Sequence, residues 1–195
     1  MNPDYSPLIP LLVVIGVPLL VFVALYNRLV GLRNLVRESW ANVDTELKRR
    51  YDLLPNLVET VRGYATHERG VLEEVARARA AAVASTGRPA SQATDENHLV
   101  QALKSLFAVV ENYPQLQANR NFLKLQQALV DTEDRIQAAR RFYNANVRDL
   151  NNKIQSFPSN LVASFFKFNA GEYFNVEEVA IRNAPAVDLG GAAKA

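Results

Sequence analysis

The most apolar stretch of the chain lies close to its first residue. Leu8 to Tyr26 contains nineteen residues and no charged side chain. As an α-helix this stretch would be about 28 Å long, which matches the hydrocarbon thickness of a bilayer. Core helices of soluble proteins are usually shorter and carry a polar stripe, so the pattern predicts a transmembrane helix.

A cleaved signal peptide is the competing interpretation, because Pro10, Gly16 and Pro18 interrupt the apolar run. A signal peptide would carry a positively charged first part, a shorter apolar core and a small-residue cleavage site. No Lys or Arg precedes Leu8, and Ala24 to Tyr26 make a poor cleavage site. We therefore expect an uncleaved anchor over residues 1–27.

Beyond the anchor, apolar residues continue at helical spacing without a turn signal. The steps of three and four residues first follow an eleven-residue repeat and then, after Tyr51, a heptad. This pattern predicts one helix from residue 28 to about residue 84, which Pro55 either bends or breaks because proline removes a backbone hydrogen bond. The stripe consists of Leu29, Leu32, Val36, Trp40, Val43, Leu47, Tyr51, Leu54, Val58, Val61 and Ala65.

Further helical patterns follow a Gly, Pro and Ser-rich loop at residues 85–94. Pro158 ends the longest of them, and Ser159 is expected to cap a last short helix. The fold class predicted is all-α, with the transmembrane helix continuing into a long antiparallel bundle of three to four helices, similar to a coiled coil. The expected bundle covers residues 28–178, its later helices cover residues 96–113, 119–157 and 159–166, and a disordered tail covers residues 179–195.

An aromatic segment follows the last predicted helix. It has five aromatic side chains within ten residues, and such a cluster would favour aggregation if it were exposed. We expect it to pack against the bundle, in the membrane interface or against another subunit, and we interpret its residues as candidate subunit or partner contacts. They are Phe165, Phe166, Phe168, Tyr173 and Phe174.

Basic residues are concentrated on the C-terminal side of the apolar stretch. The positive-inside rule therefore places the helical domain in the cytoplasm and the short N-terminus outside, with a periplasmic domain as the alternative. Arg28, Arg33 and Arg37 are near enough to the bilayer to be candidate lipid head-group contacts. Farther along, Arg49, Arg50 and Asn56 surround Pro55; the group is either a solvated helix face or a subunit or partner contact.

Composition and motifs exclude several function classes. The net charge is +2, so the chain lacks the basic excess of a nucleic-acid-binding protein, and it has no cysteine. His67 and His98 are the two histidines, and they do not have a metal-ligand spacing. The sequence contains no HExxH, no GxSxG and no phosphate-binding glycine loop. We expect no catalytic activity, cofactor, metal or small-molecule substrate.

Five blocks of the chain carry a family resemblance. They are YNRLVGLRNLV at Tyr26–Val36, WANVD at Trp40–Asp44, LKRRYDLLPNLVETVRGYATHE at Leu47–Glu68, ENYPQLQANRNFLKLQ at Glu111–Gln126 and RRFYNANVRDLNNKIQSFPSNLVA at Arg140–Ala163. In this order they resemble the LemA family of bacterial single-pass membrane proteins. The resemblance implies a membrane-anchored antiparallel helical bundle in a bacterial cell membrane, without an established enzymatic activity. One magnetosome-associated relative is implicated in shaping or assembling an internal membrane.

The sequence leads to two hypotheses for function. The first is a helical scaffold that is anchored in the lipid bilayer, forms homo-oligomers and organises a membrane or assembles partners. It is favoured because the apolar repeat passes from the anchor into the bundle without a flexible linker. The second is an adaptor or accessory subunit that binds a membrane protein partner in a protease or phosphatase system.

Overall fold

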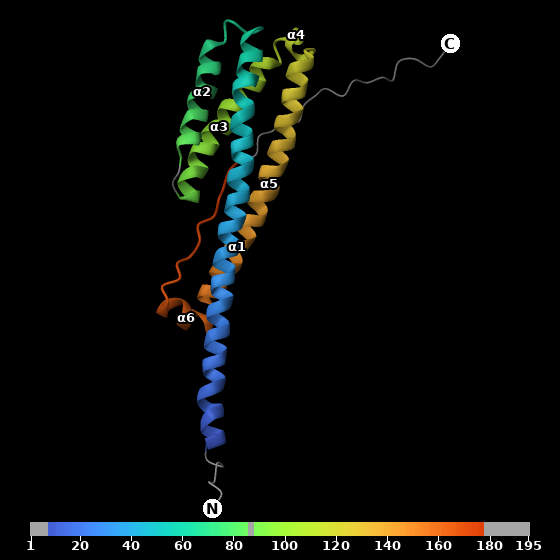
Figure 1. The fold of residues 1–195 in the computed structure, drawn as a ribbon. Coiled ribbons are helices and arrows are strands. Elements are labelled where there is room, and N and C mark those ends of the chain that lie inside the picture. Colours follow the sequence, from blue (N-terminus) through green and yellow to red (C-terminus); the bar gives the residue numbers. More distant parts are fainter. Residues whose placement is uncertain (1–7, 86–87, 178–195) are drawn as a thin grey trace, which may run out of the picture. The chain divides into compact units, whose positions relative to one another are not determined.

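A computed structural model describes residues 8–85 and 88–177, and side chains from Val14 onward. The described residues form helices and loops without a β-strand, which confirms the all-α prediction. The predicted tail at residues 179–195 and the first seven residues lie outside the described part. The helices are α1 (Leu8–Arg62), α2 (Arg69–Ala84), α3 (Pro89–Val110), α4 (Pro114–Gln117), α5 (Arg120–Gln155) and α6 (Ser159–Phe165), shown in Figure 1.

Helix α1 is continuous from the apolar stretch through Pro55 to Arg62. The alternative that Pro55 breaks the helix is therefore wrong. Proline at this position cannot donate to the carbonyl oxygen of Tyr51, four residues earlier. That oxygen instead accepts a hydrogen bond of 2.7 Å from Nε of Arg79 on α2. The helix can continue because a neighbouring side chain replaces the missing donor and Pro55 itself is exposed.

The prediction of one helix to residue 84 is wrong at a different place. The helix ends at Arg62, directly before Gly63, and α2 begins at Arg69. Glycine has the lowest helix propensity after proline. The backbone N–H groups of Tyr64 and Ala65 both donate to the carbonyl of Val61, which closes the last turn.

The later helix boundaries also differ from those predicted. Helix α3 begins at Pro89 and not at residue 96, because proline is well suited to the first turn of a helix. Helix α5 begins at Arg120, where the side chain of Asn119 accepts hydrogen bonds from the N–H groups of Asn121 and Phe122. It ends at Gln155, two residues earlier than predicted.

Ser159 does not cap α6 as predicted. Its hydroxyl donates backwards to the carbonyl oxygens of Lys153, at 2.6 Å, and Ser156, at 2.9 Å. These carbonyls belong to the end of α5 and the turn after it, where helical partners run out. Ser159 therefore stabilises the end of the preceding helix, and α6 itself ends at Phe165.

The described chain forms two compact units, and α1 and α5 contribute residues to both. The first unit contains α1 up to Leu47, α5 from Ile136, α6 and the following segment to Asn175, with a few residues at the start of α3. Helices α1 and α5 are antiparallel in it, since Trp40 contacts Tyr143 while Leu29 lies in one cluster with Leu150.

The second unit contains parts of five helices, and the four longer ones, α1, α2, α3 and α5, run in alternating directions. It contains α1 from Lys48, α2, most of α3, α4 and α5 up to Arg135. Helix α2 returns along α1, α3 runs parallel to α1 and α5 returns again, as Figure 1 shows. Every predicted stripe position from Leu54 to Ala65 is buried in this unit, so the apolar pattern identified its core correctly.

Candidate functional site

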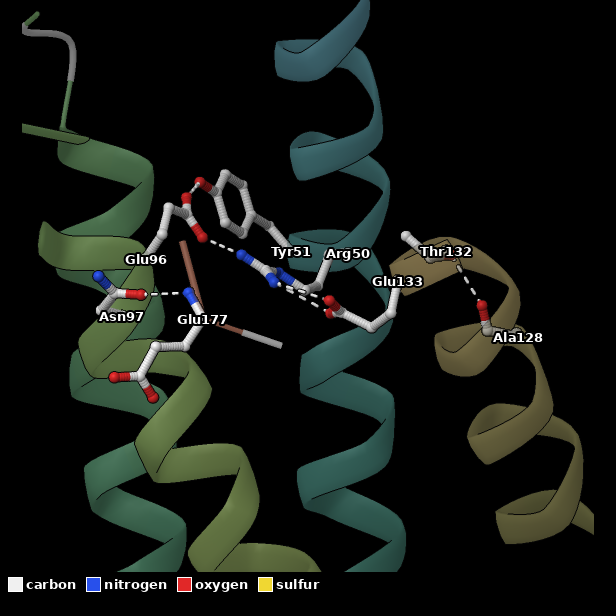
Figure 2. A network of polar contacts seen from close by, with 8 residues as sticks. All are labelled: Arg50, Tyr51, Glu96, Asn97, Ala128, Thr132, Glu133 and Glu177. Carbon is white, nitrogen blue, oxygen red and sulfur yellow. Dashed lines mark hydrogen bonds and ion pairs between the residues drawn. The ribbon is translucent and has the colours of Figure 1, made fainter. Parts of the chain in front are cut away.

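The most polar part of the second unit's interior is a charged network around Arg50 (Figure 2). Nη1 of Arg50 donates to the two carboxylate oxygens of Glu133 on α5, at 2.9 and 3.3 Å. Nη2 forms an ion pair with Glu96 on α3, and the hydroxyl of Tyr51 donates to the same carboxylate. Arg50 and Glu96 are fully buried, and the side chain of Glu133 is 8% exposed. Three helices are thus joined through one guanidinium group.

Burial decides what this network can do. A substrate has no access to a guanidinium group that is completely covered by the chain. Among residues 8–85 and 88–177, no group of three or more His, Asp or Glu is arranged to hold a metal ion. The arrangement is that of an internal connection between helices, and Arg50 cannot be the subunit or partner contact that the sequence suggested.

Glu96 and Glu133 were not among the residues predicted from the sequence, although their spacing contains a signal. Arg50 follows Leu47 by three residues and precedes Leu54 by four, so it lies on the same helix face as these stripe residues, next to Tyr51. Glu96 precedes Leu99 by three residues, and Glu133 follows Leu129 by four. Charges of opposite sign at core positions of different helices are expected to pair, because an unpaired buried charge is very costly.

The other two residues predicted as contacts around Pro55 lie on the surface. Arg49 and Asn56 are exposed, and their role as subunit or partner contacts stays a prediction.

Beside Pro55 the chain forms a groove of about 280 Å³ between α1 and α2. Its lining combines five aliphatic residues with Glu59, Arg62 and Arg79. Glu59 is paired with Arg62 at 3.1 Å, and Arg79 donates to the carbonyl of Tyr51, so each of these charged side chains has a partner within the chain.

The first unit carries an outward-facing apolar helix surface. The described part of the chain has one helix that could span a membrane by length and composition. Its most apolar window has a mean hydropathy of 1.9, and 6% of that window is buried by the rest of the chain. Core helices of soluble proteins are mostly buried, whereas this apolar window of α1 is almost entirely exposed. The exposed large side chains are Val14, Ile15, Val17, Leu19, Leu20, Val21, Phe22 and Val23.

Aromatic side chains gather where this surface ends. The ring of Phe166 lies 5.8 Å from that of Phe22 and 4.6 Å from that of Tyr26. Phe165 lies 6.4 Å from Phe22, and Phe168 lies 6.0 Å from Tyr26. Three aromatic residues, from α6 and the residues directly after it, are thereby placed against the last turns of the apolar stretch.

The basic residues predicted to meet lipid head groups follow directly. Arg28, Arg33 and Arg37 are all exposed. The guanidinium group of Arg33 lies 5.1 Å from the ring centre of Phe168, a distance typical of a cation–π contact. The positions are compatible with the predicted head-group contacts, which stay a prediction.

The extended segment after α6 is held by asparagine side chains of α5. Asn151 donates to the carbonyl of Gly171 at 3.0 Å and accepts from its N–H at 2.8 Å. Asn144, two helical turns earlier, makes the same pair of bonds with Phe174, at 3.0 and 2.9 Å. Each amide thus acts as a neighbouring strand would, which satisfies backbone groups that have no helix to bind them.

The asparagine contacts place Phe174 inside the first unit. Its side chain is fully buried, and its ring lies 5.2 Å from that of Trp40 in an edge-to-face arrangement. The predicted role of Phe174 as a subunit or partner contact is therefore wrong, because the chain's own Trp40 already occupies that contact. Tyr173, the neighbouring residue, is 42% exposed, and its predicted contact stays open.

Tyr143 supports the same segment and has a shifted pKa. Its hydroxyl donates to the carbonyl of Glu172 at 2.8 Å. Burial, and second the nearby carboxylate of Glu172, raise the pKa of Tyr143 to about 12. An unfolded chain would lose this proton near pH ~10. The folded state therefore holds the proton more tightly.

This shift predicts a specific alkaline instability. The contribution of Tyr143 is fully present below about pH 10 and is lost as the pH rises through 12, because the unfolded state loses its proton first. The free energy of unfolding of the detergent-solubilised chain should fall with pH in this range. Tyr143→Phe should lower stability at neutral pH and reduce that slope. Parallel pH curves for the two proteins would contradict the assignment.

Comparison with known proteins places these features in a family. The family model described as LemA family matches residues 39–189, which is most of the chain. The chain belongs to the LemA family. The matched region begins next to Trp40 and includes all three residues of the buried ion network. The sequence resemblance is thereby confirmed.

Curated relatives of this LemA-family chain include proteins of different bacteria. Magnetosome protein MamQ 2 of Paramagnetospirillum magneticum is 27% identical over 174 residues, which cover 76% of the chain. Magnetosome protein MamQ of Magnetospirillum gryphiswaldense is 26% identical over 175 residues, which cover 77% of the chain. The matches span 64% of the length of both relatives. Protein LemA of Metamycoplasma hominis is 24% identical over 165 residues, covering 85% of the chain and 75% of the relative.

Proposed function

We propose that this LemA-family chain is a membrane-anchored helical scaffold that self-associates, organises a membrane or assembles partners, and does no catalysis itself. One observation carries the proposal. The N-terminal part of α1 exposes a continuous apolar surface, and the same helix continues into the buried stripe of the first unit at Leu29 and Leu32. A helix of this kind would connect lipid to folded protein without a linker.

The interior of the chain also favours a scaffold. The charged groups of the Arg50 network all bind one another across three helices, so none is available to a substrate. In the groove at Pro55, the carboxylate of Glu59 is paired with Arg62. The relatives that are named as magnetosome proteins agree with a role in organising a membrane. The excess of exposed arginines after Tyr26 supports a cytoplasmic location for the two units.

Self-association has a backbone argument in its favour. Pro18 removes the hydrogen bond to the carbonyl of Val14, as Pro55 does for Tyr51. In the second unit Arg79 supplies a replacement donor. The region around Pro18 is almost uncovered by the described chain, and lipid tails offer no donor. Apart from Tyr26, the stretch has no side chain that could donate a hydrogen bond, so a neighbouring copy of the helix would shield this carbonyl by close packing and not by donating to it.

The test is the mass of the full-length chain extracted in mild detergent, measured by sedimentation over a range of protein concentrations. We expect a defined oligomer, and we expect Pro18→Ala to weaken it because the helix then satisfies its own backbone. A strict monomer at all concentrations would contradict the self-association. Capture of one different protein at fixed stoichiometry would instead favour an adaptor that serves another membrane protein.

A further inference from the structure

Helix α6 has two apolar faces, and the chain covers one of them. Val162 and Ala163 are buried in a cluster with Leu29, Leu32 and Leu150. Exposed apolar side chains of α6 and of the residues that flank it form a second set, which we call the α6 apolar surface. It consists of Phe157, which is 79% exposed, Leu161 at 61%, Phe165 at 74% and Phe166 at 43%.

The position of this surface along α1 can be given from ring contacts. Phe165 and Phe166 both contact Phe22, at 6.4 and 5.8 Å between ring centres. Phe22 precedes Tyr26, the last residue of the uncharged stretch, by one helical turn, or about 6 Å. If the stretch crosses a bilayer, these rings lie just inside the edge of the hydrocarbon layer. Trp and Tyr concentrate at this depth in membrane proteins, and Phe and Leu are typical of the inserted face of interfacial helices.

Basic residues follow the aromatic residues directly along both chain segments. Arg28 follows Tyr26 by two residues, and the exposed Lys167 follows Phe166 directly. The chain reverses at Lys167, which has a φ of 54°, and the N–H of Phe168 donates to the carbonyl of Ala163. This turn joins the aromatic rings of α6 to a basic group, which is the order that the acyl and phosphate layers of a lipid leaflet require.

We propose that the α6 apolar surface inserts into the interfacial layer of the bilayer that α1 crosses, as a second contact between the chain and lipid. The proposal rests on the membrane anchor of the proposed function. Lipid is the occupant because the surface is continuous with the anchor through Phe22 and Tyr26. Any surface at this depth is surrounded by lipid unless another protein displaces it.

Tryptophan fluorescence of the full-length chain in vesicles tests the proposal. The vesicles contain phosphatidylcholine and phosphatidylglycerol, with or without bromine atoms on the acyl chains near the head groups. Reporters are introduced in separate variants, Phe165→Trp and Leu161→Trp, with Leu20→Trp as the reference for the anchor. The native Trp40 is the built-in control, since it lies 18 residues beyond Phe22, about 27 Å along the helix.

We expect brominated lipid to quench the added emission of Leu20→Trp, Phe165→Trp and Leu161→Trp, and to leave the emission of Trp40 unchanged. Aqueous acrylamide should quench the two α6 reporters weakly. Circular dichroism establishes which variants keep the native helix content. If one of the two α6 variants does not fold, the other still reports on the same surface.

Other results would overturn the proposal in distinguishable ways. Strong quenching of both α6 reporters by acrylamide, with Leu20→Trp quenched by lipid, would place α6 in water and leave the anchor intact. Protection of the α6 reporters from both quenchers would show that a second copy of the chain covers them. Failure of lipid to quench Leu20→Trp would contradict the anchor itself.

Discussion

Replacement of Arg50 by alanine is expected to lower the free energy of unfolding by about 3–5 kcal/mol, because it leaves two carboxylates without their partner in the interior. Both Glu96 and Glu133 receive hydrogen bonds from this one side chain. Arg50→Lys should also be strongly destabilising, since the single nitrogen of an ammonium group cannot take the two separate positions from which Nη1 and Nη2 reach Glu133 and Glu96. Chemical denaturation of the full-length chain in detergent, followed by circular dichroism, measures the effect.

A matched control is available on the same helix. Arg62 forms an exposed ion pair with Glu59 at 3.1 Å. Exposed pairs contribute about 0–1 kcal/mol, so Arg62→Ala should change stability little. If Arg50→Ala and Arg62→Ala lowered the free energy of unfolding equally, the buried Arg50 network would contribute no more to stability than an exposed ion pair.

A triple variant separates the cost of a broken network from the value of an intact one. In R50M/E96Q/E133L the buried charges are removed together, and the amide oxygen introduced at position 96 remains an acceptor for the hydroxyl of Tyr51. Apolar replacement of a whole buried ion network is often neutral or stabilising. We expect the triple variant to regain most of the stability that Arg50→Ala loses. If the triple variant stays as unstable as Arg50→Ala, the intact charged network stabilises the fold more than an uncharged replacement does.

Replacement of Phe174 by alanine is the other change with a large expected effect, about 3–5 kcal/mol. The ring is fully buried, and it packs on Trp40 in the first unit. Its removal leaves a cavity that the segment held by Asn144 cannot easily close. Because Trp40 is the chain's single tryptophan, its fluorescence emission should shift to longer wavelength as water reaches the ring.

Phe142 on α5 provides the control for this substitution. It is an aromatic residue of the same unit, but its side chain is 52% exposed. Phe142→Ala should alter stability by no more than about 0.5 kcal/mol and leave the emission of Trp40 unchanged. A similar loss for both variants would mean that Phe174 is not part of the core.

The apolar pattern predicted the helices well because each helix buries one face. Leu54, Val58 and Val61 lie in the core as their spacing required. The boundaries were less predictable, since they depend on groups that are distant in the sequence. Pro55 does not end α1 because Arg79 of another helix replaces its missing hydrogen bond. Local propensity alone cannot reveal such a donor.

Some of the predicted contact residues are buried and others are exposed, and the sequence did not distinguish them. Arg49, Arg50 and Asn56 belong to one charged region of the sequence, yet Arg50 is buried and the other two are exposed. Phe165 and Phe174 belong to one aromatic segment, yet Phe174 lies in the core and Phe165 is 74% exposed. Residue type was a poor guide to burial here, because the partners Glu96, Glu133 and Trp40 come from other elements.

By itself the sequence determined the family, the all-α class and the apolar helix at the N-terminal side, because these depend on composition and on periodicity along one chain. Only the tertiary structure decided which charges pair and which aromatic rings remain uncovered. Those outcomes depend on which helices are neighbours, and hydrophobic periodicity does not specify neighbours. The rings of Phe165 and Phe166 beside Phe22 are the clearest example, since Phe165 follows Phe22 by 143 positions in the sequence and folding brings the two together.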